Sequence, residues 1–580
     1  MVKIIRKIFK ILDTQKKKEF KILIILMFLS MILETVGIGA MIPLINFFTD
    51  GNILLPYDIN LNQTLLNFGI PENNILNFML IILILIFLIK NIYIGFYSWV
   101  ESKFAYKIRF DLGVRLFSKY LYNPYAFHLS NNSSNLISKI VQETAVYGSA
   151  VIHLSTFLTE VLIIFGLITL LLLIKPQETF IIILIGFFFS SIYYFGLKNL
   201  ISRWGKKREA TERAKMKSLK QGLGAIKDII FYNAQRYFID IFNSDSNDLS
   251  KVGFKMYFLG KLPKVWFEMI AITVMTFVIF FLHLKKVDPS TIIATVSIFL
   301  MTSLRIIPSI NRILTSLQEI KYSEASFDSL LIDLAPAKKF PKIDKINQSD
   351  NKINFQKEIK FNDVFFNYSK SDKPVLKNVS LTLKKNEFIG IIGETGTGKS
   401  TFVDLFIGLL FPNKGTITVD GKNINSNLEG WKEKLGYVPQ NLYLLDESIR
   451  NNVAFGYKEN ELNIAKVASS VEKSQLTKFV KNLKDGLLSN VGERGVKISG
   501  GEKQRLGIAR ALYNDPGILI FDEATSSLDL ETEKRILETL IKIKKNKTII
   551  FVTHRISSLS YCDKIFEVQN NEIKEIKKFD

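Results

Sequence analysis

The chain has 580 residues, too many for one ordinary domain, so we expect at least two. Its residues are 48% hydrophobic and its mean hydropathy is +0.19, both high for a water-soluble protein. The formal net charge is +22. Because Lys and Arg also gather in the cytoplasmic loops of membrane proteins, this charge does not by itself indicate nucleic-acid binding. The single cysteine, Cys562, excludes a disulfide within the chain and a multi-cysteine metal site.

Six apolar stretches in the first part of the chain are long enough to cross a bilayer, which takes about 20 residues. We place them near residues 20–48, 75–100, 150–174, 178–200, 265–284 and 288–315. Basic residues precede the first stretch, and residues 49–74 contain no Lys or Arg, which predicts a cytoplasmic N-terminus. The first stretch is of full span length, so we expect no cleavable signal peptide.

The connections between these stretches are informative. The two long connections, near 101–149 and 201–264, carry charges at helical spacing, so we expect the membrane helices to continue into the cytoplasm. Leu and Ile recur at near-helical spacing in residues 61–68. This segment is either a short amphipathic helix on the outer surface or an ordinary surface loop.

After about residue 340 the pattern becomes that of a soluble α/β protein, and a phosphate-binding motif stands near its start. The segment "GETGTGKST" fits G-x-x-x-x-G-K-[ST] and lies between the strand-like "FIGII" and the helix-like "FVDLFIGLL". Its residues are Gly393, Glu394, Thr395, Gly396, Thr397, Gly398, Lys399, Ser400 and Thr401. The glycines allow backbone N–H groups to approach phosphate oxygens, Lys399 can reach the β- and γ-phosphates, and Ser400 can bind Mg²⁺. The motif therefore predicts ATP and Mg²⁺ as ligands.

Two further segments fit the same chemistry. In "ILIFDEATSSLD" an apolar run ends in Asp522, which would help to hold Mg²⁺, and Glu523, which would polarise the attacking water. In "ISGGEKQRLGIARAL" a helix-like run opens at Ser499, Gly500, Gly501 and Glu502. Exposed N–H groups at a helix N-terminus favour an anion.

Taken together, "GETGTGKST", "ISGGE", "ILIFDE" and "THR" make residues 355–575 resemble the nucleotide-binding domain of ABC transporters. The resemblance implies an adenine-stacking role for Tyr368, a Mg²⁺ contact for Gln440, a D-loop role for Asp529 and a switch role for His554. Glu523, His554 and Gln440 are then the catalytic candidates, and Ser400, Gln440 and Asp522 the metal candidates. "VGERG", with Glu493 and Arg494, resembles the exporter X-loop. Glu502 departs from the family, which usually has Gln there.

The resemblance also implies an architecture. Six spans ahead of one nucleotide-binding domain resemble a half-transporter of the exporter branch, so a homodimer with two ATP sites is implied. The expected fold is an α-helical six-span transmembrane domain (1–325), a linker (326–352) and an α/β P-loop ATPase domain (353–580). Segments 121–134 and 218–229 match the family's two coupling helices. The expected location is the bacterial inner membrane, with the nucleotide-binding domain in the cytoplasm.

Charged residues inside the apolar stretches are the remaining signal, because such charges are rare and usually functional. They are Glu34, Lys90, Lys264, Glu268, Arg305 and Arg312. For Lys264 and Arg312, side chains that reach the membrane interface are an adequate interpretation. Lys90 and Arg305 favour an anionic cargo, because cationic side chains pair well with phosphate.

A closer resemblance points the same way. "TSLRIIPSINRILTSLQEIKYSEASFDSL", "LPKVWFEMI" and "VDLFIGLL" are similar to bacterial lipid-linked oligosaccharide flippases of the PglK type. This implies a polyprenyl-pyrophosphate oligosaccharide as cargo, with Lys90, Lys264 and Arg305 as candidate contacts. The flippase pattern favours Arg at the first two of these positions.

Other functions remain open at this point. The same scaffold serves exporters of peptides, drugs or other lipids. We expect no peptidase domain before the first span, which counts against a peptide-processing exporter. A membrane ATPase that does not transport is disfavoured by Glu523, His554 and the two apparent coupling segments. A nucleic-acid ATPase is disfavoured because the soluble part shows no basic, aromatic cluster.

Overall fold

The computed structural model describes residues 2–50, 54–55, 59–60, 71, 74–174, 176–286, 288–335, 353–368, 373–525 and 528–577. The contacts within the chain divide it into two compact units. The first comprises Met1–Asn123 and His128–Pro336, and the second comprises Pro124–Phe127 and Ala337–Asp580.

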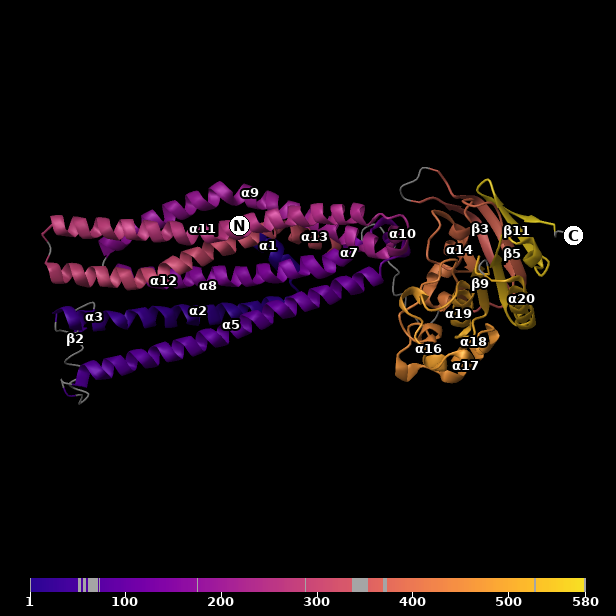
Figure 1. Cartoon of the computed structure of the whole chain (residues 1–580), viewed down its shortest axis with the longest axis horizontal. Helices are drawn as coiled ribbons and strands as arrows, with labels where there is room; N and C mark the ends of the chain where they lie inside the picture. The colour runs from indigo at the N-terminus through magenta and orange to yellow at the C-terminus, as the bar shows by residue number, and fades with distance from the viewer. Residues whose placement is uncertain are drawn as a thin grey trace. The chain divides into compact units, whose positions relative to one another are not determined.

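The first unit is helical (Figure 1). Its helices are α1 (Val2–Ile11), α2 (Thr14–Gly39), α3 (Met41–Asp50), α5 (Ile75–Leu121), α7 (Ser133–Ser138), the π-helical η2 (Lys139–Glu143), α8 (Thr144–Ile174), α9 (Pro176–Gly224), α10 (Ile226–Phe231), α11 (Gln235–Leu284), α12 (Pro289–Tyr322) and α13 (Glu324–Leu334). The short α6 (Tyr125–Ser130) begins among the residues grouped with the second unit. Among the described residues, six helical stretches are long and apolar enough to cross a membrane, which confirms the six predicted spans.

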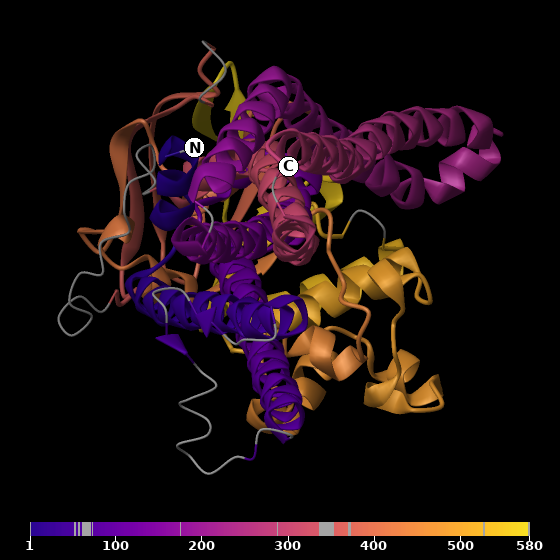
Figure 2. The ribbon, with the colours of Figure 1, turned by 90° about the vertical axis from the view of Figure 1, so that its left-hand side faces the viewer.

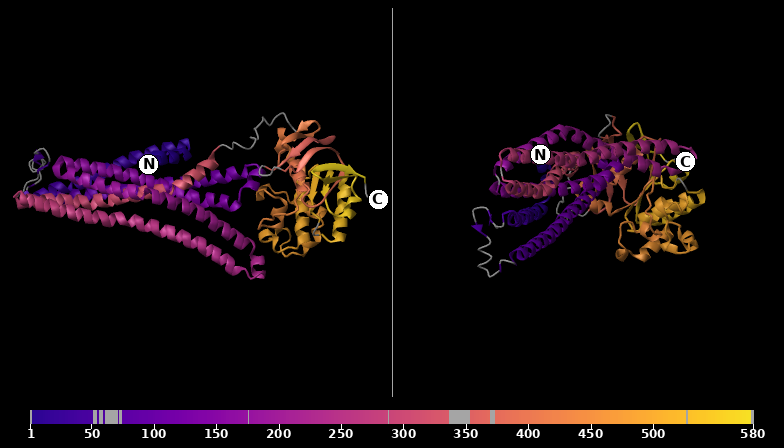
Figure 3. Two further views of the ribbon diagram at one scale, coloured as in Figure 1. Left: turned by 90° about the horizontal axis from the view of Figure 1, so that it is seen from above. Right: turned by 60° about the vertical axis from the view of Figure 1, so that its left-hand side comes forward.

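Three of these helices are much longer than a membrane is thick. α5, α9 and α11 contain 47, 49 and 50 residues. At about 1.5 Å per residue each is roughly 70 to 75 Å long, whereas the hydrocarbon core is about 30 Å thick. The helices therefore continue past the membrane, as the charged connections predict. α9 and α11 lie side by side and are joined through α10 (Figure 3). Figure 2 shows this pair extending away from the other helices of its unit.

Apolar side chains cover the outer faces of the spans. Ile84, Phe187 and Phe277 are examples of large apolar residues that stay exposed in the single chain. Water-soluble surfaces rarely carry so many, so these faces fit lipid or a partner chain.

The helices approach one another most closely at glycines. A Cβ atom added to Gly205 of α9 would lie 2.1 Å from the carbonyl oxygen of Tyr322, the last residue of α12. A Cβ added to Gly166 of α8 would lie 2.3 Å from the Thr35 hydroxyl oxygen on α2. Glycine is thus what allows these two backbone crossings, as it does generally where membrane helices pack tightly.

The start of the predicted linker is helical. Residues 326–334 belong to α13, whose Phe327 and Leu330 are fully buried. The Phe327 ring meets Tyr147 of α8 edge to face at 5.8 Å, and Lys7 of α1 forms ion pairs with Glu324 and Asp328. This segment therefore packs within the first unit. Residues 336–352 of the predicted linker lie outside the described residues.

Between α3 and α5 the structure describes a two-residue antiparallel ladder of β1 (Leu54–Leu55) and β2 (Ile59–Asn60). The segment 61–68, interpreted above as a helix or a loop, lies outside the described residues.

The second unit is an α/β fold with two sheets. The larger has the order β12-β11-β5-β10-β9-β8 and is parallel except for β12; the smaller is antiparallel with the order β4-β3-β6-β7. The strands are β3 (Glu358–Phe366), β4 (Leu376–Lys384), β5 (Phe388–Ile392), β6 (Lys414–Val419), β7 (Lys422–Asn423), β8 (Leu435–Val438), β9 (Ile518–Asp522), β10 (Thr548–Val552), β11 (Lys564–Gln569) and β12 (Glu572–Ile576). The helices are α14 (Lys399–Phe406), α15 (Leu428–Lys432), α16 (Ile449–Val453), α17 (Ile464–Lys473), α18 (Thr477–Asn482), α19 (Gly500–Leu512), α20 (Leu530–Lys544) and α21 (Ile556–Leu559).

The larger sheet forms the core of this unit. Every residue of β9 and of β10 is buried. Such continuous apolar strands are typical of parallel sheets that are covered on both faces.

Candidate functional site

The predicted nucleotide-binding residues follow neighbouring strands of the larger sheet. The P-loop (393–398) follows β5, and His554 follows β10. Asp522 ends β9 and Glu523 comes directly after it, and Gln440 follows β8. These four strands are adjacent and parallel. Because the carboxyl ends of parallel strands meet at one edge, segments far apart in the sequence come together there.

The P-loop has the backbone that its glycines predict. Gly396 and Gly398 have φ angles of +86° and +110°, a region that L side chains rarely adopt. A Cβ on Gly398 would also lie 3.1 Å from the Val375 side chain. The loop then opens directly into α14, so its N–H groups and the helix N-terminus can face phosphate oxygens.

Lys399 is the first residue of α14, and its side chain folds back onto this loop. Its Nζ donates hydrogen bonds to the carbonyl oxygens of Gly393 and Glu394, both at 2.8 Å. Burial lowers the pKa of Lys399, whereas the carboxylates of Glu523 and Asp522 oppose that shift. An ammonium group enclosed by the loop fits a phosphate chain bound in it.

Asp522 has the position expected of a metal-binding acid. Only 5% of it is exposed, and burial together with the charge of Glu523 raises its pKa to about 6. Among the described residues, no three His, Cys, Asp or Glu side chains group closely enough to hold a metal by themselves. Mg²⁺ usually takes one or two carboxylates, waters and substrate phosphates, and the carboxylate of Asp522 at the end of β9 and the hydroxyl of Ser400 in the first turn of α14 have the chemistry of such a site.

Glu523 joins two of the other candidates. Its Oε1 lies 2.8 Å from His554 Nε2, and its Oε2 accepts a hydrogen bond of 2.6 Å from Gln440 Nε2. Its φ is +51°, in the left-handed region, and its N–H donates to the Val552 carbonyl oxygen at 3.0 Å. A strained backbone held by a strand hydrogen bond is frequent at functional positions. The structure thus brings together the three residues predicted to be catalytic.

Tyr368 lies next to the helix that the P-loop opens. Its hydroxyl is 3.0 Å from Thr401 Oγ1, and its ring meets Phe366 edge to face at 5.1 Å. The ring is therefore held close to the P-loop, where a stacked base fits.

The residues 499–502, at the start of the "ISGGE" helix that corresponds to the signature helix of ABC transporters, cap α19 at its N-terminus. Ser499 Oγ accepts from the Glu502 N–H at 3.3 Å, and Glu502 Oε2 accepts from the Ser499 N–H at 2.7 Å. This reciprocal pair is a capping box, which glutamate and glutamine both make, so the departure at Glu502 costs the helix nothing. In the described part of the chain, the hydrogen bonds of these two residues do not reach the P-loop.

Asp529 caps α20 in a simpler way. Its Oδ1 accepts from the Thr532 N–H at 2.8 Å, and this hydrogen bond holds the pKa of Asp529 below its usual value.

Arg305 is the centre of an ionic network in the membrane part. Its guanidinium nitrogens lie 3.1 Å from Glu34 on α2 and 3.5 Å from Glu160 on α8. Glu160 also pairs with Arg312 at 2.6 Å and accepts from the Ser309 hydroxyl at 2.6 Å. One glutamate from each of two helices thus meets α12.

Lys90 of α5 completes the network. Its Nζ lies 3.4 Å from Glu34, and its stem packs against Gly37 of α2. Glu34, Lys90 and Glu160 are each at most 9% exposed. Lys264 instead forms an ion pair of 3.8 Å with Glu268, one turn along α11, and both side chains are exposed.

Two family models match the chain in the order of its two units. The model described as "ABC transporter transmembrane region" matches residues 23–305, and the model described as "ABC transporter" matches residues 376–526. The chain belongs to the ABC transporters. It is an ATP-hydrolysing half-transporter of the exporter type.

Curated relatives of this ABC transporter include several ATP-dependent lipid A-core flippases. The one from Photorhabdus laumondii is 27% identical over 525 residues, covering 88% of this chain and 87% of the relative. The one from Pasteurella multocida is 27% identical over 517 residues with the same coverage, and the one from Aliivibrio fischeri is 26% identical over 553 residues, covering 93% and 91%.

A solved structure has the same fold. It is described as "Structure of a bacterial Atm1-family ABC exporter with ATP bound", has a TM-score of 0.78 and 20% identity, and covers 97% of this chain and 95% of its own. This likeness, together with the six spans and the α/β unit, confirms the predicted fold class.

Two members of the ionic network of this transporter were not found from its sequence. Glu160 lies in the third apolar stretch and Ser309 lies within a turn of Arg305 and Arg312. An acid inside an apolar span was the available signal for Glu160, as it was for Glu34. For Ser309 the sequence carries no such signal, because serines are common in spans.

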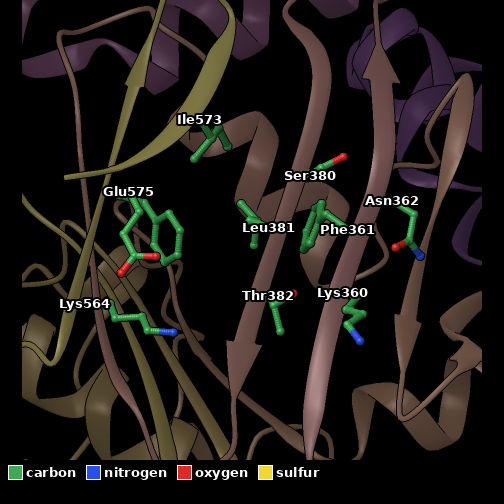
Figure 4. Close-up of a pocket in the computed structure, with 10 residues that line it drawn as sticks. Lys360, Phe361, Asn362, Ser380, Leu381, Thr382, Lys564, Ile573 and Glu575 are labelled. Atoms are coloured by element: carbon green, nitrogen blue, oxygen red, sulfur yellow. The ribbon is translucent and has the colours of Figure 1, made fainter.

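One surface hollow of the second unit is separate from these residues. It is lined by strands β3, β4, β11 and β12 (Figure 4). Both of its lysines have partners nearby: Lys360 pairs with Glu358, and Lys564 pairs with Glu387 at 3.2 Å. None of its lining residues belongs to the nucleotide-binding motifs.

Proposed function

We propose that this ABC exporter moves a lipid-linked oligosaccharide, carried on a polyprenyl pyrophosphate, across the bacterial inner membrane. The observation that carries the proposal is the network of Glu34, Lys90, Glu160, Arg305 and Arg312. Among the described residues, two carboxylates meet three cations in this network, so it carries one excess positive charge within the membrane helices.

An uncompensated cation inside a membrane is costly and is usually kept for function. A pyrophosphate head group supplies the missing negative charge. Two of its oxygens can accept parallel hydrogen bonds from one planar guanidinium group. The polyprenyl tail can remain in lipid while the head group moves. Curated relatives that are lipid flippases support a lipid cargo. An exporter of peptides, drugs or other lipids is the alternative.

We further propose that two copies of the chain form the working transporter. Each chain has one P-loop and one signature helix, and the caps of Ser499 and Glu502 stay within their own helix. Around α10, large apolar side chains stand exposed in the single chain. They are Leu223, Ile226, Ile230, Phe231 and Tyr232. A second copy would cover such a patch.

The roles we propose in hydrolysis are those that the motifs and the family resemblance imply, and the geometry of the site supports them. Lys399 and the P-loop N–H groups bind the phosphates, and Tyr368 stacks on adenine. Ser400, Asp522 and Gln440 would hold Mg²⁺, which when bound offsets phosphate charge. Glu523 orients and polarises the attacking water, and His554, 2.8 Å away, fixes the glutamate and contacts the γ-phosphate. The N-terminus and the ATPase unit lie in the cytoplasm.

The test is flipping of a fluorescent polyprenyl-pyrophosphate oligosaccharide in proteoliposomes. The same tail and glycan joined through an uncharged link is the matched control lipid. We expect ATP-dependent loss of the pyrophosphate lipid from the leaflet that faces the ATPase, and little movement of the uncharged one.

Variants of the network sharpen this test. Arg305→Lys keeps the charge that Glu34 and Glu160 require but removes the planar fork, so flipping should fall while basal ATP hydrolysis remains. Lys255→Gln, at an exposed position of α11 outside the network, is the control. Equal transport of both lipids, or ATP hydrolysis with no lipid movement, would favour the alternative cargoes.

A further inference from the structure

Glu533 is a buried acid for which the ATP site described above has no role. It lies in the first turns of α20 and is 3% exposed. An isolated buried carboxylate would be very unfavourable, so its partners must offset the loss of hydration.

Those partners come from the two segments that follow the catalytic candidates. Thr525 Oγ1 donates to Glu533 Oε1 at 2.9 Å, and Thr525 is two residues after Glu523. Ser558 Oγ donates to the same oxygen at 2.9 Å. The guanidinium of Arg555, the residue after His554, pairs with Glu533 Oε2.

Arg555 extends the connection to a third segment. Its two terminal nitrogens each lie 3.4 Å from the carbonyl oxygen of Leu528, the residue before Asp529. Its own backbone N–H donates to Thr553 Oγ1 at 3.0 Å, which fixes the turn that presents His554. One carboxylate therefore fastens the segments after β9 and β10 to each other and to the start of α20.

We infer that Glu533 is a positioning residue for ATP hydrolysis: it sets the distance between Glu523 and His554 by holding Thr525 and Arg555. Its Oε2 forms the ion pair with Arg555, and its Oε1 accepts the hydrogen bonds from the hydroxyl groups of Thr525 and Ser558. Catalytic groups must be held within a fraction of an ångström, and misplacement by about 1 Å can lower a rate by roughly a hundredfold. This inference rests on the roles proposed for Glu523 and His554 in ATP hydrolysis and does not depend on the proposed cargo.

The main test is Glu533→Gln in the full-length transporter reconstituted in lipid. Glutamine keeps the shape and an oxygen for Thr525 and Ser558 but removes the charge that holds Arg555. We expect kcat for MgATP to fall about tenfold or more, while KM changes by less than about twofold. Glu531→Gln, two residues earlier on the exposed face of α20, should leave both constants unchanged.

The second readout separates positioning from mere stability. If Glu533 acts through Glu523, then Glu533→Gln added to Glu523→Gln should lower the residual hydrolysis little further, because residues that act as a unit are not additive. The inference would be overturned if the rate losses of Glu533→Gln and Glu523→Gln multiplied in full in the double variant. It would also be overturned if Glu533→Gln left kcat unchanged, whether or not KM rose.

A third variant covers the case in which Glu533→Gln does not fold. Thr525→Val removes one donor and keeps the branched shape, and it should lower kcat by about threefold at unchanged KM. No loss of kcat in a folded Thr525→Val protein would equally overturn the inference.

Discussion

Glutamate side chains of this chain differ in their surroundings, and the differences decide what each can do. Glu34 and Glu160 are buried among cations in the membrane helices, where they keep their partners in place. In the described part of the chain, the carboxylate of Glu523 contacts Gln440 and His554, at the edge of the sheet where the P-loop lies. A carboxylate held by one neutral amide and one imidazole is available to polarise water.

Replacing Glu523 by glutamine should stop turnover without preventing nucleotide binding. The amide keeps the contacts to Gln440 and His554 but cannot take a proton from water, and loss of a general base typically lowers rates by about 10²- to 10⁴-fold. Phosphate release and binding of a fluorescent ATP analogue would measure the two properties. Glu538→Gln, on an exposed face of α20, is the control. Turnover near the wild-type value would remove Glu523 from the mechanism.

At the scale of helices, the first unit is held together by buried ion pairs and by close backbone crossings. Arg208 of α9 donates to Glu143 of η2 at 2.9 Å and to Ser326 of α13 at 2.7 Å. Glu143 and Arg208 are 1% and 6% exposed. One guanidinium therefore joins three helical segments, including the one that follows the last span.

Breaking this pair from one side should be more damaging than removing it altogether. Arg208→Met leaves Glu143 buried without its cation, which should cost about 3–5 kcal/mol of stability. Adding Glu143→Gln should recover most of that loss, because no charge is then left unpaired. Thermal unfolding in one detergent would compare the three proteins. A double variant less stable than Arg208→Met would contradict the expectation.

The glycines of α9 provide a matched test of helix packing. Gly205→Ala would place a methyl group 2.1 Å from the Tyr322 carbonyl oxygen, so backbone must shift, which should cost about 1–3 kcal/mol. Gly196→Ala, on the same helix, has no atom within 4 Å of the new methyl group. It should be neutral or stabilising by up to about 1 kcal/mol. Unfolding midpoints would compare them, and equal effects would show that the crossing adapts.

The sequence predicts the elements of this transporter better than the pairing of its charges. Apolar length identifies six spans, and local motifs identify the nucleotide-binding residues, because both signals are contained in short segments. The partners of Arg305 are on helices more than a hundred residues away in sequence, and their meeting depends on how the helices pack. The helical start of the predicted linker was missed for a similar reason, since α13 is stabilised by Tyr147 and Lys7.

At the scale of the whole molecule, we propose that two copies of the chain form the transporter. In this arrangement the P-loop of one copy would pair with the signature helix of the other, which gives two shared ATP sites. Two lesions can test this pairing: Lys399→Ala disables the P-loop, and Ser499→Arg blocks the signature cap. Each alone should abolish hydrolysis in the homodimer.

The informative comparison uses differently tagged chains purified as heterodimers. When the two lesions are on different chains, one shared site retains both an intact P-loop and an intact signature helix, so hydrolysis should return to about half of wild type if the sites act independently. When both lesions are on one chain and the other is wild type, each shared site has one lesion and hydrolysis should stay low. Sites contained within single chains would give the reverse order, because the wild-type chain would then be intact. The same substitutions in two arrangements therefore distinguish the two architectures by which heterodimer hydrolyses ATP.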